Sequence, residues 1–213
     1  KNPKIMWMPP SKYYPNVRND NLLTNISNFI DCEIENISYF SGIDSLHEYI
    51  ARAFLEKGDK VTMLMPTYDN FRAVCDASDA EVIKLDYFNN GQHSKTIEFN
   101  TKIVYLANPN NPTGELLSIE LIKEMLKVNN ETLFVIDEAY IEFGGESAVS
   151  LVGEFKNVLV CRTLSKAFCL AGIRFGYCVA HSEIVNSLDA IRNPKSVTML
   201  SQIIAEKAIS ENS

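Results

Sequence analysis

Several sequence features that identify common protein classes are missing from this chain. No run of lysine and arginine offsets the net charge of −7, which argues against nucleic acid as the main partner. No apolar stretch approaches the roughly 20 residues that a transmembrane helix needs. Residues 1–16 also lack the continuous apolar core of a signal peptide. We therefore expect neither a nucleic-acid partner nor a membrane partner.

Paired cysteines are also missing. The five cysteines are odd in number and form no CxxC pair, and the three histidines are far apart in the sequence, so no metal signature appears. We therefore expect no bound metal. Free thiols are typical of a reducing compartment, which predicts a cytoplasmic protein. The cysteines are Cys32, Cys75, Cys161, Cys169 and Cys178.

Short apolar runs alternate with helical patterns along the 213 residues, of which 46% are hydrophobic. Strands are expected at residues 61–65, 81–85, 103–107, 132–136, from 158 onward and at 176–180, with a turn at 89–91. Helices are expected at residues 22–30, 45–54, 67–76, 118–127, 184–191 and 197–209. The strands are continuous apolar runs, as in a parallel sheet covered on both faces. The expected fold is therefore a three-layer α/β/α domain with a mostly parallel sheet, in which ligands bind beyond the carboxyl ends of the strands.

The most informative stretch is VLVCRTLSKAFCLAGIRFGY, at residues 158–177. A β-branched run at 158–160 predicts a buried strand, and the polar cluster RTLSK follows it. Lysine is rarely buried without a partner, and burial would lower the pKa of Lys166 toward a nucleophilic free amine. Ser165 and Arg174 add a hydroxyl and a permanent cation, which suit a phosphate. An amine nucleophile next to groups that bind an anion is what an enzyme needs to hold pyridoxal phosphate as a Schiff base. The alternative is that Lys166 is a solvated loop residue and Arg174 a surface charge.

Two further features follow predicted strands. Tyr68 lies just beyond the strand at 61–65, where its ring could stack on a planar heteroaromatic ring; the alternative is a half-buried core tyrosine. The loop NPNNPTG, at residues 108–114, contains two Asn-Pro steps and a glycine, which make it rigid and leave asparagine amides free to donate and accept. A turn explains one such step but not the whole heptad. We therefore expect a functional loop.

Asp137 follows the apolar strand at 132–136, and a carboxylate there needs a cationic partner or several donors. A protonated pyridine nitrogen would be such a partner. Two unit charges about 4 Å apart gain roughly 4 kcal/mol at an effective dielectric near 20, enough to keep that proton in place. The alternative is that Asp137 caps the following segment. At residues 41–45, SGIDS, a glycine precedes the bare N–H groups of a helix start, which predicts an anion site.

Three motifs carry a family resemblance: NPNNPTG, then VIDEAYIEF, then RTLSKAFCLAGIRFGY. In this order and spacing, the chain resembles the fold-type-I pyridoxal-phosphate aminotransferases, and within them the histidinol-phosphate aminotransferase group. The likeness extends from Tyr14 to about residue 210. It implies the large domain of that fold, pyridoxal 5′-phosphate as the cofactor, and a homodimer with its sites at the subunit interface.

The resemblance also implies roles for matching residues. Lys166 would form the Schiff base and carry the proton between the substrate Cα and the cofactor C4′. Asp137 would pair with the pyridine nitrogen, and Tyr68 would stack on the ring; these three are the expected catalytic residues. The other expected cofactor contacts are Asn111 and Tyr140 at the 3′-oxygen, Ser165, Arg174 and the backbone of Ile43 and Asp44 at the phosphate, and Tyr14 at the phosphate of the partner subunit. The bond between Asn111 and Pro112 is expected to be cis.

The chain departs from the family pattern in two places. Ile43 stands where family members often have a small residue, so a side-chain contact to phosphate would be lost while the backbone donors remain. The sequence also stops after the helix at 197–209, without the smaller domain whose arginine binds the substrate carboxylate in this family. The expected parts are an N-terminal arm segment at 1–30, the cofactor-binding large domain at 31–195, and a helix at 196–213 leading toward the absent small domain.

These residues predict a pyridoxal-phosphate-dependent aminotransferase. It would move an amino group between a small amino acid or amino alcohol, phosphorylated or not, and a 2-oxo acid. A decarboxylase of a phosphorylated amino acid on the same fold would share every residue named here, because the bond held perpendicular to the ring selects the reaction. A non-catalytic ligand-binding module, as in some transcription regulators, is a third alternative. The intact set of Asp137, Lys166 and Arg174, without a basic helix-turn-helix segment, favours an enzyme.

Overall fold

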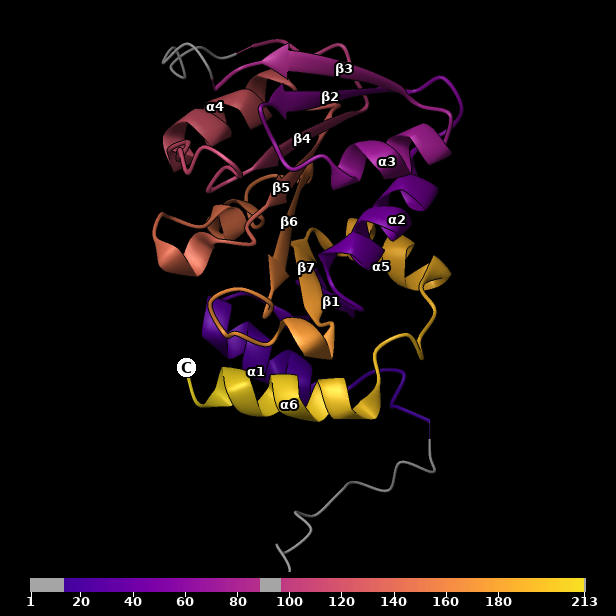
Figure 1. The fold of residues 1–213 in the computed structure, drawn as a ribbon, viewed down its shortest axis with the longest axis vertical. Helices are drawn as coiled ribbons and strands as arrows, with labels where there is room; N and C mark the ends of the chain where they lie inside the picture. Colours follow the sequence, from indigo (N-terminus) through magenta and orange to yellow (C-terminus); the bar gives the residue numbers. More distant parts are fainter. Residues whose placement is uncertain (1–13, 89–96, 213) are drawn as a thin grey trace, which may run out of the picture.

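A computed structural model describes residues 14–88 and 97–212, and a single sheet organises them (Figure 1). Seven strands in this part of the chain lie in the order β1-β7-β6-β5-β4-β2-β3. Their bounds are β1 (Ile37–Phe40), β2 (Lys60–Met65), β3 (Glu81–Asp86), β4 (Ile103–Ala107), β5 (Leu133–Asp137), β6 (Val158–Thr163) and β7 (Gly176–Ala180).

Strand direction decides which chain ends meet. Strands β2 to β6 pair in parallel, whereas β7 is antiparallel to both of its neighbours, β6 and β1. A parallel return would need a crossover connection, usually a helix, but residues 164–175 hold only a 3₁₀ turn. The amino end of β7 therefore lies at the same edge of the sheet as the carboxyl ends of the parallel strands. The predicted mostly parallel α/β sheet is confirmed.

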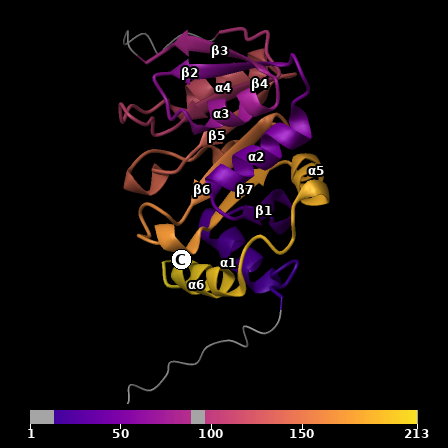
Figure 2. The ribbon, with the colours of Figure 1, turned by 45° about the vertical axis from the view of Figure 1, so that its right-hand side comes forward.

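Helices cover both faces of the sheet (Figures 1 and 2). They are α1 (Asp20–Ile30), α2 (Ile43–Phe54), α3 (Asn70–Ala77), α4 (Ile119–Val128), α5 (Ser182–Ile191) and α6 (Met199–Ser210), with 3₁₀ turns at Ile34–Asn36, Ile141–Phe143, Ala148–Leu151 and Ala171–Ile173. Side chains alternate along each strand: Val104 and Leu106 join a core cluster with α1, α4 and α6, while Ile103 and Tyr105 join one with α2, α3 and α5. The layers are therefore α/β/α, as predicted.

Helix α2 has no side-chain cap at its first turn, unlike α1, α4 and α6. The helices α1, α4 and α6 begin with Asn19, Ser118 and Thr198, whose side chains accept hydrogen bonds from backbone N–H groups of the first turn. Helix α2 begins after Gly42, which offers no side-chain cap. Its first N–H groups have no partner within the helix and stay available to a ligand.

The predicted helices and strands are all present, with ends that differ by at most three residues. Two details of the prediction are wrong. Strand β1 was not expected, and β6 continues to Thr163, so the first two residues of the polar cluster RTLSK lie inside a strand. Arg162 is tolerated there because Glu138 and Glu142 pair with its guanidinium. The turn expected at 89–91 lies outside the described residues.

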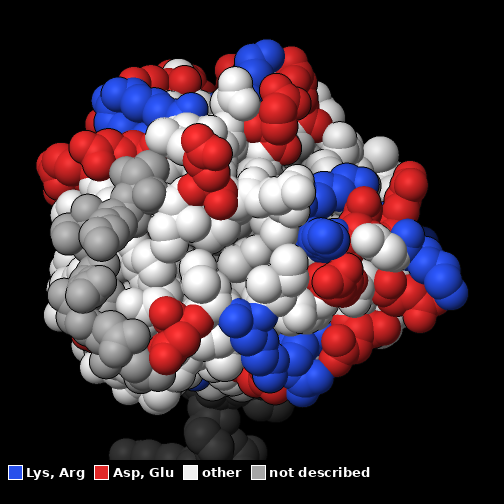
Figure 3. Space-filling model, turned by 90° about the horizontal axis from the view of Figure 1, so that it is seen from above, with Lys and Arg blue, Asp and Glu red and all other residues white. Residues whose placement is uncertain are grey.

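Helices α1 and α6 pack against each other and share one apolar cluster with the sheet. The expected division at residues 30 and 195 stays a prediction, and residues 1–13 lie outside the described ranges. Among the helices that the structure describes, none combines the length and the apolar content that crossing a membrane requires. On the face seen in Figure 3, basic and acidic side chains are interspersed, and no continuous basic area forms.

Candidate functional site

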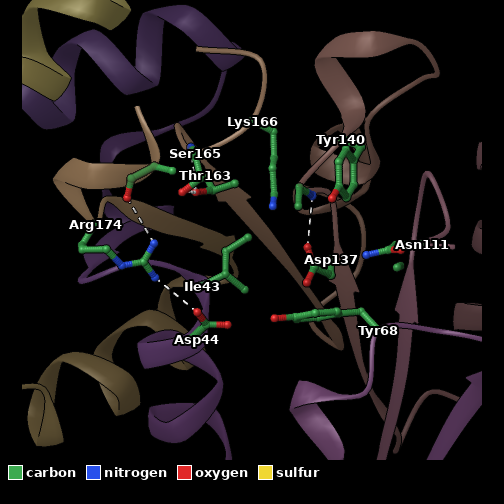
Figure 4. A pocket seen from close by; sticks show the side chains of 13 residues that line it. Ile43, Asp44, Tyr68, Asn111, Asp137, Tyr140, Thr163, Ser165, Lys166 and Arg174 are labelled. Carbon is green, nitrogen blue, oxygen red and sulfur yellow. Dashed lines mark hydrogen bonds and ion pairs between the residues drawn. The ribbon is translucent and has the colours of Figure 1, made fainter. Parts of the chain in front are cut away.

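An open pocket lies where the carboxyl ends of β4, β5 and β6 meet the amino ends of α2 and β7. It brings together nearly every residue that the sequence singles out (Figure 4). The predicted residues that line it are Ile43, Asp44, Tyr68, Asn111, Asp137, Tyr140, Ser165, Lys166 and Arg174. They come from six separate segments of the chain, so it is the topology of the sheet that assembles them.

One end of the pocket is built to hold an anion. Arg174 points into it beside the start of α2, and its Nη2 atom lies 3.2 Å from Asp44 Oδ2. Asp44 in turn accepts a hydrogen bond of 2.7 Å from Asn70 Nδ2, which fixes the carboxylate that holds the guanidinium. The N–H groups of Ile43 and Asp44 open the helix at the same place. A cation, a helix N-terminus and free N–H groups together suit a phosphate.

Two glycines allow the close approach at this end. Gly42 has φ +86°, and a Cβ atom there would lie 2.6 Å from Arg174 Nη2. A Cβ atom on Gly176 would lie 2.9 Å from both the carbonyl carbon of Gly42 and the nitrogen of Ile43. A side chain at position 42 would displace the guanidinium of Arg174, and one at position 176 would push the helix start away from β7. The glycines therefore form the cradle into which an anionic group fits.

Thr163 positions the hydroxyl of Ser165. The Thr163 Oγ1 atom lies 2.9 Å from Ser165 Oγ and 3.0 Å from the carbonyl oxygen of Phe175, and it accepts a hydrogen bond of 3.1 Å from Ser165 N–H. Thr163 is buried, whereas Ser165 is partly exposed and lines the pocket. Thr163 therefore holds the serine hydroxyl on the anion side.

The opposite end carries a buried carboxylate. Asp137 is 5% exposed, and burial raises its pKa from 3.8 to about 6. Ala139 N–H donates to its Oδ1 atom at 3.0 Å, and the Tyr105 hydroxyl donates to Oδ2 at 3.1 Å. The carboxylate therefore caps the following segment, as the alternative predicts, and it also lines the pocket; its pairing with a ring nitrogen stays a prediction. A cationic ring nitrogen placed against it would restore the charged form.

In the loop at 108–114, two asparagines stabilise the backbone and the third lines the pocket. The Asn108 side chain exchanges two hydrogen bonds with the backbone of Leu117, and Asn110 Nδ2 donates to the carbonyl oxygen of Pro66 at 2.9 Å. Asn111 instead points into the pocket. The bond between Asn111 and Pro112 is cis, as predicted.

Lys166 extends between the two ends of the pocket (Figure 4). Its Nζ atom lies 5.4 Å from the ring centroid of Tyr140. The burial considered for this lysine is absent: Lys166 and Arg174 are both exposed, because the pocket opens to solvent. They nevertheless point into it, which is not the arrangement of two surface charges. Tyr68 is 43% exposed and enters from the side opposite Lys166, so its ring forms a wall and not part of the core.

A buried ion-pair cluster secures the segment that carries Tyr140. Arg162 Nη1 lies 3.1 Å from Glu138 Oε2, and Arg162 Nη2 lies 2.8 Å from Glu142 Oε1. The Ser147 hydroxyl and the Ala148 N–H also donate to Glu138, each at 2.7 Å. These bonds tie residues 138–148 to β6 and so place the tyrosine beside the pocket.

Tyr14 is the one predicted site residue outside the pocket. Its side chain is 75% exposed, and Lys195 Nζ lies 4.1 Å from the centre of its ring. Nothing within the described part of the chain brings an anion site to it. Its expected contact with a partner subunit stays a prediction.

This arrangement can hold a planar aromatic ring with an anionic group at one end and a protonated nitrogen at the other. The ring would lie between Tyr68 and Lys166, with the amine of Lys166 able to attack a carbonyl carbon on it. Asn111 and Tyr140 flank the same end as Asp137 and could bind a ring oxygen. The donor set fits such a molecule without any change of fold.

Several residues that shape the site were not singled out from the sequence. They are His47, Tyr105, Thr163 and Gly176. His47 had a detectable signal, since it shares the apolar face of α2 with Leu46 and Ile50, where a polar residue is unusual. Gly176 had none, because its role depends on a contact with the distant segment at Gly42 and Ile43.

The sequence profile of the class I and II aminotransferases matches residues 4–213. Among curated proteins, a dihydroxyacetone phosphate transaminase of Campylobacter jejuni is 42% identical over 213 residues, covering 93% of this chain and 56% of its own. A histidinol-phosphate aminotransferase of Ruminiclostridium cellulolyticum is 35% identical over 214 residues, covering 97% of this chain and 60% of its own. The chain thus spans less than two thirds of the length of these relatives.

Solved structures give the same result. The histidinol-phosphate aminotransferase of Sinorhizobium meliloti, in complex with pyridoxal-5′-phosphate, superposes with a TM-score of 0.86 at 26% identity. The match covers 95% of this chain and 57% of that one. The described fold and the sequence motifs therefore lead to the same group of proteins.

Proposed function

The chain belongs to the class I and II aminotransferase family, and from this we propose that the complete protein is a pyridoxal-phosphate-dependent aminotransferase. It would resemble the histidinol-phosphate aminotransferases. The amino group would pass between a small amino acid or amino alcohol, phosphorylated or not, and an oxo acid or oxo compound. The observation that carries the proposal is the single pocket in which the Lys166 amine lies between an anion cradle and the buried carboxylate of Asp137.

The anion end fits the phosphate of the cofactor. Arg174 and Ser165 would bind its oxygens from one side, and the N–H groups of Ile43 and Asp44 from the helix start. The glycine at position 42 leaves the space for this contact. The isoleucine at position 43 adds only its backbone, as the sequence suggests.

At the other end, each side chain meets one part of the ring. Asp137 would keep the ring nitrogen protonated, Asn111 and Tyr140 would bind the 3′-oxygen, and Tyr68 would stack on one face. When bound, pyridoxal phosphate supplies an electron-withdrawing ring that stores the charge released at the substrate Cα. Lys166 would tether the cofactor and, when released by substrate, move the proton at the substrate Cα. The exposed position of Lys166 gives its amine the freedom that both tasks need.

We further propose that the protein is a cytoplasmic homodimer. The five cysteines are free thiols, which is typical of a reducing compartment. The exposed ring of Tyr14 supports a contact with a second copy of the chain, in which its hydroxyl would donate to the phosphate of the partner subunit. The dimer would then complete each site with one residue from its neighbour.

The test is an assay of the complete protein with pyridoxal phosphate. Amino donors would include glutamate and histidinol phosphate, and acceptors would include 2-oxo acids and dihydroxyacetone phosphate, because relatives named for these phosphorylated compounds are 35% and 42% identical. We expect amino transfer without release of CO₂. Release of CO₂ from a phosphorylated amino acid would favour the decarboxylase alternative, and failure to bind the cofactor would refute the proposal.

A further inference from the structure

His47 is a buried polar residue with no evident partner. It lies on α2 and is fully buried, and within residues 14–88 and 97–212 neither of its ring nitrogens has a hydrogen-bond partner. A buried polar group left unpaired costs about 1–3 kcal/mol, so such groups are rare in native folds. Its position therefore needs a physical explanation.

The imidazole ring is held in a definite orientation. Phe71 and Tyr105 contact it edge to face, with ring centroids at 5.0 Å and 5.5 Å and interplanar angles of 73° and 85°. In this orientation its Nε2 atom lies 3.8 Å from Asp137 Oδ2. This distance is slightly longer than a hydrogen bond, and a small movement of either side chain would close it.

The contact is not an ion pair. Burial lowers the pKa of His47 to about 4, and the nearby Asp44 on the same helix only partly opposes this. The groups that face the imidazole from the other elements are Asp137 of β5 and Tyr105 of β4, while α3 contributes the apolar ring of Phe71. At pH 7 His47 is therefore neutral, with a proton on one nitrogen only. A neutral imidazole can donate a hydrogen bond without changing the charge of the site.

Asp137 has room for this donor. An ionised carboxylate has about four acceptor positions, two on each oxygen. Ala139 N–H occupies one on Oδ1, and the Tyr105 hydroxyl occupies one on Oδ2. A proton on His47 Nε2 would take the second position on Oδ2. The one position that remains, on Oδ1, is left for a donor in the pocket.

We propose that His47 is a positioning residue that donates from Nε2 to Asp137 Oδ2 and so aims the remaining acceptor of the carboxylate at the ring nitrogen of the cofactor. The proposal rests on the proposed function for the identity of that cofactor. It adds to the site a residue of the buried face of α2 that belongs to none of the motifs and does not line the pocket. His47 does not touch the reacting atoms and acts only through Asp137.

A matched pair of ligands tests this role. The complete protein, stripped of cofactor, would be titrated with pyridoxal phosphate and with its 1-deaza analogue, in which a CH group replaces the ring nitrogen. We expect His47→Leu to bind pyridoxal phosphate about tenfold more weakly, a change of about 1.4 kcal/mol. Affinity for the deaza analogue should not change, because that ligand offers Asp137 no N–H group. His47→Gln, which keeps an amide donor, should recover most of the loss.

His181→Gln serves as the control, since that histidine caps α5 and does not line the pocket. Equal loss for both ligands in His47→Leu would show a merely structural role and overturn the proposal, as would no loss for either ligand. Failure of the unaltered protein to bind pyridoxal phosphate would instead refute the proposed function. The two failures are therefore distinguishable.

A second measurement uses the unaltered protein, so a folding defect in the leucine variant cannot affect it. Nitrogen-15 NMR of the histidine side chains reports which ring nitrogen carries the proton, and variants of His181 and His93 assign the remaining signal to His47. We expect a neutral ring at pH 7 with its proton on Nε2. A proton on Nδ1 alone, or on both nitrogens, would overturn the proposal.

Discussion

Gly42 and Arg174 lie so close that a Cβ atom on the glycine would stand 2.6 Å from Nη2 of the arginine. The guanidinium thus occupies the space that the missing side chain leaves at the start of α2. This contact joins the segment after β1 to the segment before β7, two strands that pair antiparallel at the edge of the sheet. The anion cradle depends on it.

Gly42→Ala should therefore weaken binding of the cofactor phosphate. The added methyl group displaces the Arg174 guanidinium, so we expect at least a tenfold loss of affinity for pyridoxal phosphate, about 1.4 kcal/mol. Affinity for pyridoxal, which lacks the phosphate, should change little. Fluorescence titration of the cofactor-free protein with both ligands measures the difference.

Gly58→Ala is the matched control for that variant. Both glycines have φ +86°, so alanine carries a similar backbone strain at either position, but nothing lies within 4 Å of a Cβ atom at Gly58. Both variants should lose stability, and only Gly42→Ala should lose affinity for the phosphate. A similar loss of affinity in both would mean that the cradle is not specific to Gly42.

Asp137→Asn should reduce turnover far more than it reduces affinity for the cofactor. Without its charge, the side chain cannot keep the ring nitrogen protonated, so we expect a loss of 10²-fold or more in turnover, about 2.7 kcal/mol. Cofactor affinity should fall much less, because the phosphate contacts remain. Turnover and cofactor titration on the same preparation test this. If the turnover of the variant stayed within a few-fold of that of the unaltered protein, the carboxylate would be only a cap.

In the absence of the cofactor, Asp137→Asn should be more stable toward unfolding than the unaltered protein. Burial raises the pKa of Asp137 from 3.8 to about 6, so the folded protein holds this proton more tightly than the unfolded chain does. The stability that the protonated form contributes is complete below about pH 4 and is lost as the pH rises through 6. At pH 7–8, the free energy of unfolding of Asp137→Asn should therefore be about 2–3 kcal/mol higher than that of the unaltered protein. The difference should vanish below pH 4. Urea unfolding across this pH range measures it.

The sequence predicts the parts of the fold that local patterns specify. Apolar runs at 103–107 and 176–180 correspond to β4 and β7 without any change of bounds. Polar residues that follow such runs, such as Asp137 and Lys166, were predicted to meet, because parallel strands place their carboxyl ends together.

What the sequence does not specify is pairing between distant segments. Three of the four residues of β1 favour strands, but so short a run does not predict a strand on its own, and it forms one because β7 offers an antiparallel edge. Arg162 reads as part of a loop until Glu138 and Glu142 are seen to neutralise it. His47 stands out in the sequence as a polar residue on an apolar helix face, but its link to the site is seen only once Asp137 is found 3.8 Å away. Each of these depends on a tertiary contact that no local pattern encodes.

Arg162→Leu tests how firmly the buried cluster holds the segment of Tyr140. Removing the arginine leaves Glu138 buried without its cation, which typically costs about 3–5 kcal/mol. Arg72→Leu is the control, because Arg72 also pairs with two carboxylates, Asp69 and Asp76, but at the surface, where an ion pair contributes about 1 kcal/mol or less. The urea midpoint should therefore fall much further in Arg162→Leu than in Arg72→Leu. Equal midpoints would mean that the cluster adds no more than a surface pair does.

Lys166→Ala should abolish both turnover and the visible absorption of the bound cofactor. The amine of Lys166 is the nucleophile that the pocket presents to a carbonyl carbon. Borohydride treatment of the unaltered protein should attach the cofactor covalently to Lys166, which peptide mass spectrometry would locate. Lys156→Ala, which removes a surface lysine paired with Glu183, should leave both readouts unchanged. An active alanine variant at position 166 would end the assignment.

Tyr14→Phe should weaken cofactor retention about tenfold or more, because a hydrogen bond to a charged group contributes about 1.5–3 kcal/mol. Tyr14 is 75% exposed and lies outside the pocket of its own chain, so we expect the loss to come from the site of a partner subunit. Equilibrium dialysis of the cofactor measures it. Dilution of the unaltered protein into monomers should loosen the cofactor in the same way. A stable monomer that stays fully loaded would contradict the dimeric site.

Hybrid dimers decide whose tyrosine serves which site. Mixing the Tyr14→Phe protein with the Lys166→Ala protein should form dimers in which one site combines an intact Lys166 with an intact Tyr14 from the other copy. Activity should therefore rise on mixing, since the two-fold symmetry of a homodimer gives each hybrid one complete site. If Tyr14 instead acts within its own chain, the subunit that keeps Lys166 still lacks Tyr14, and mixing should bring no gain. An unchanged activity after confirmed subunit exchange would place Tyr14 with its own domain and remove it from the interface.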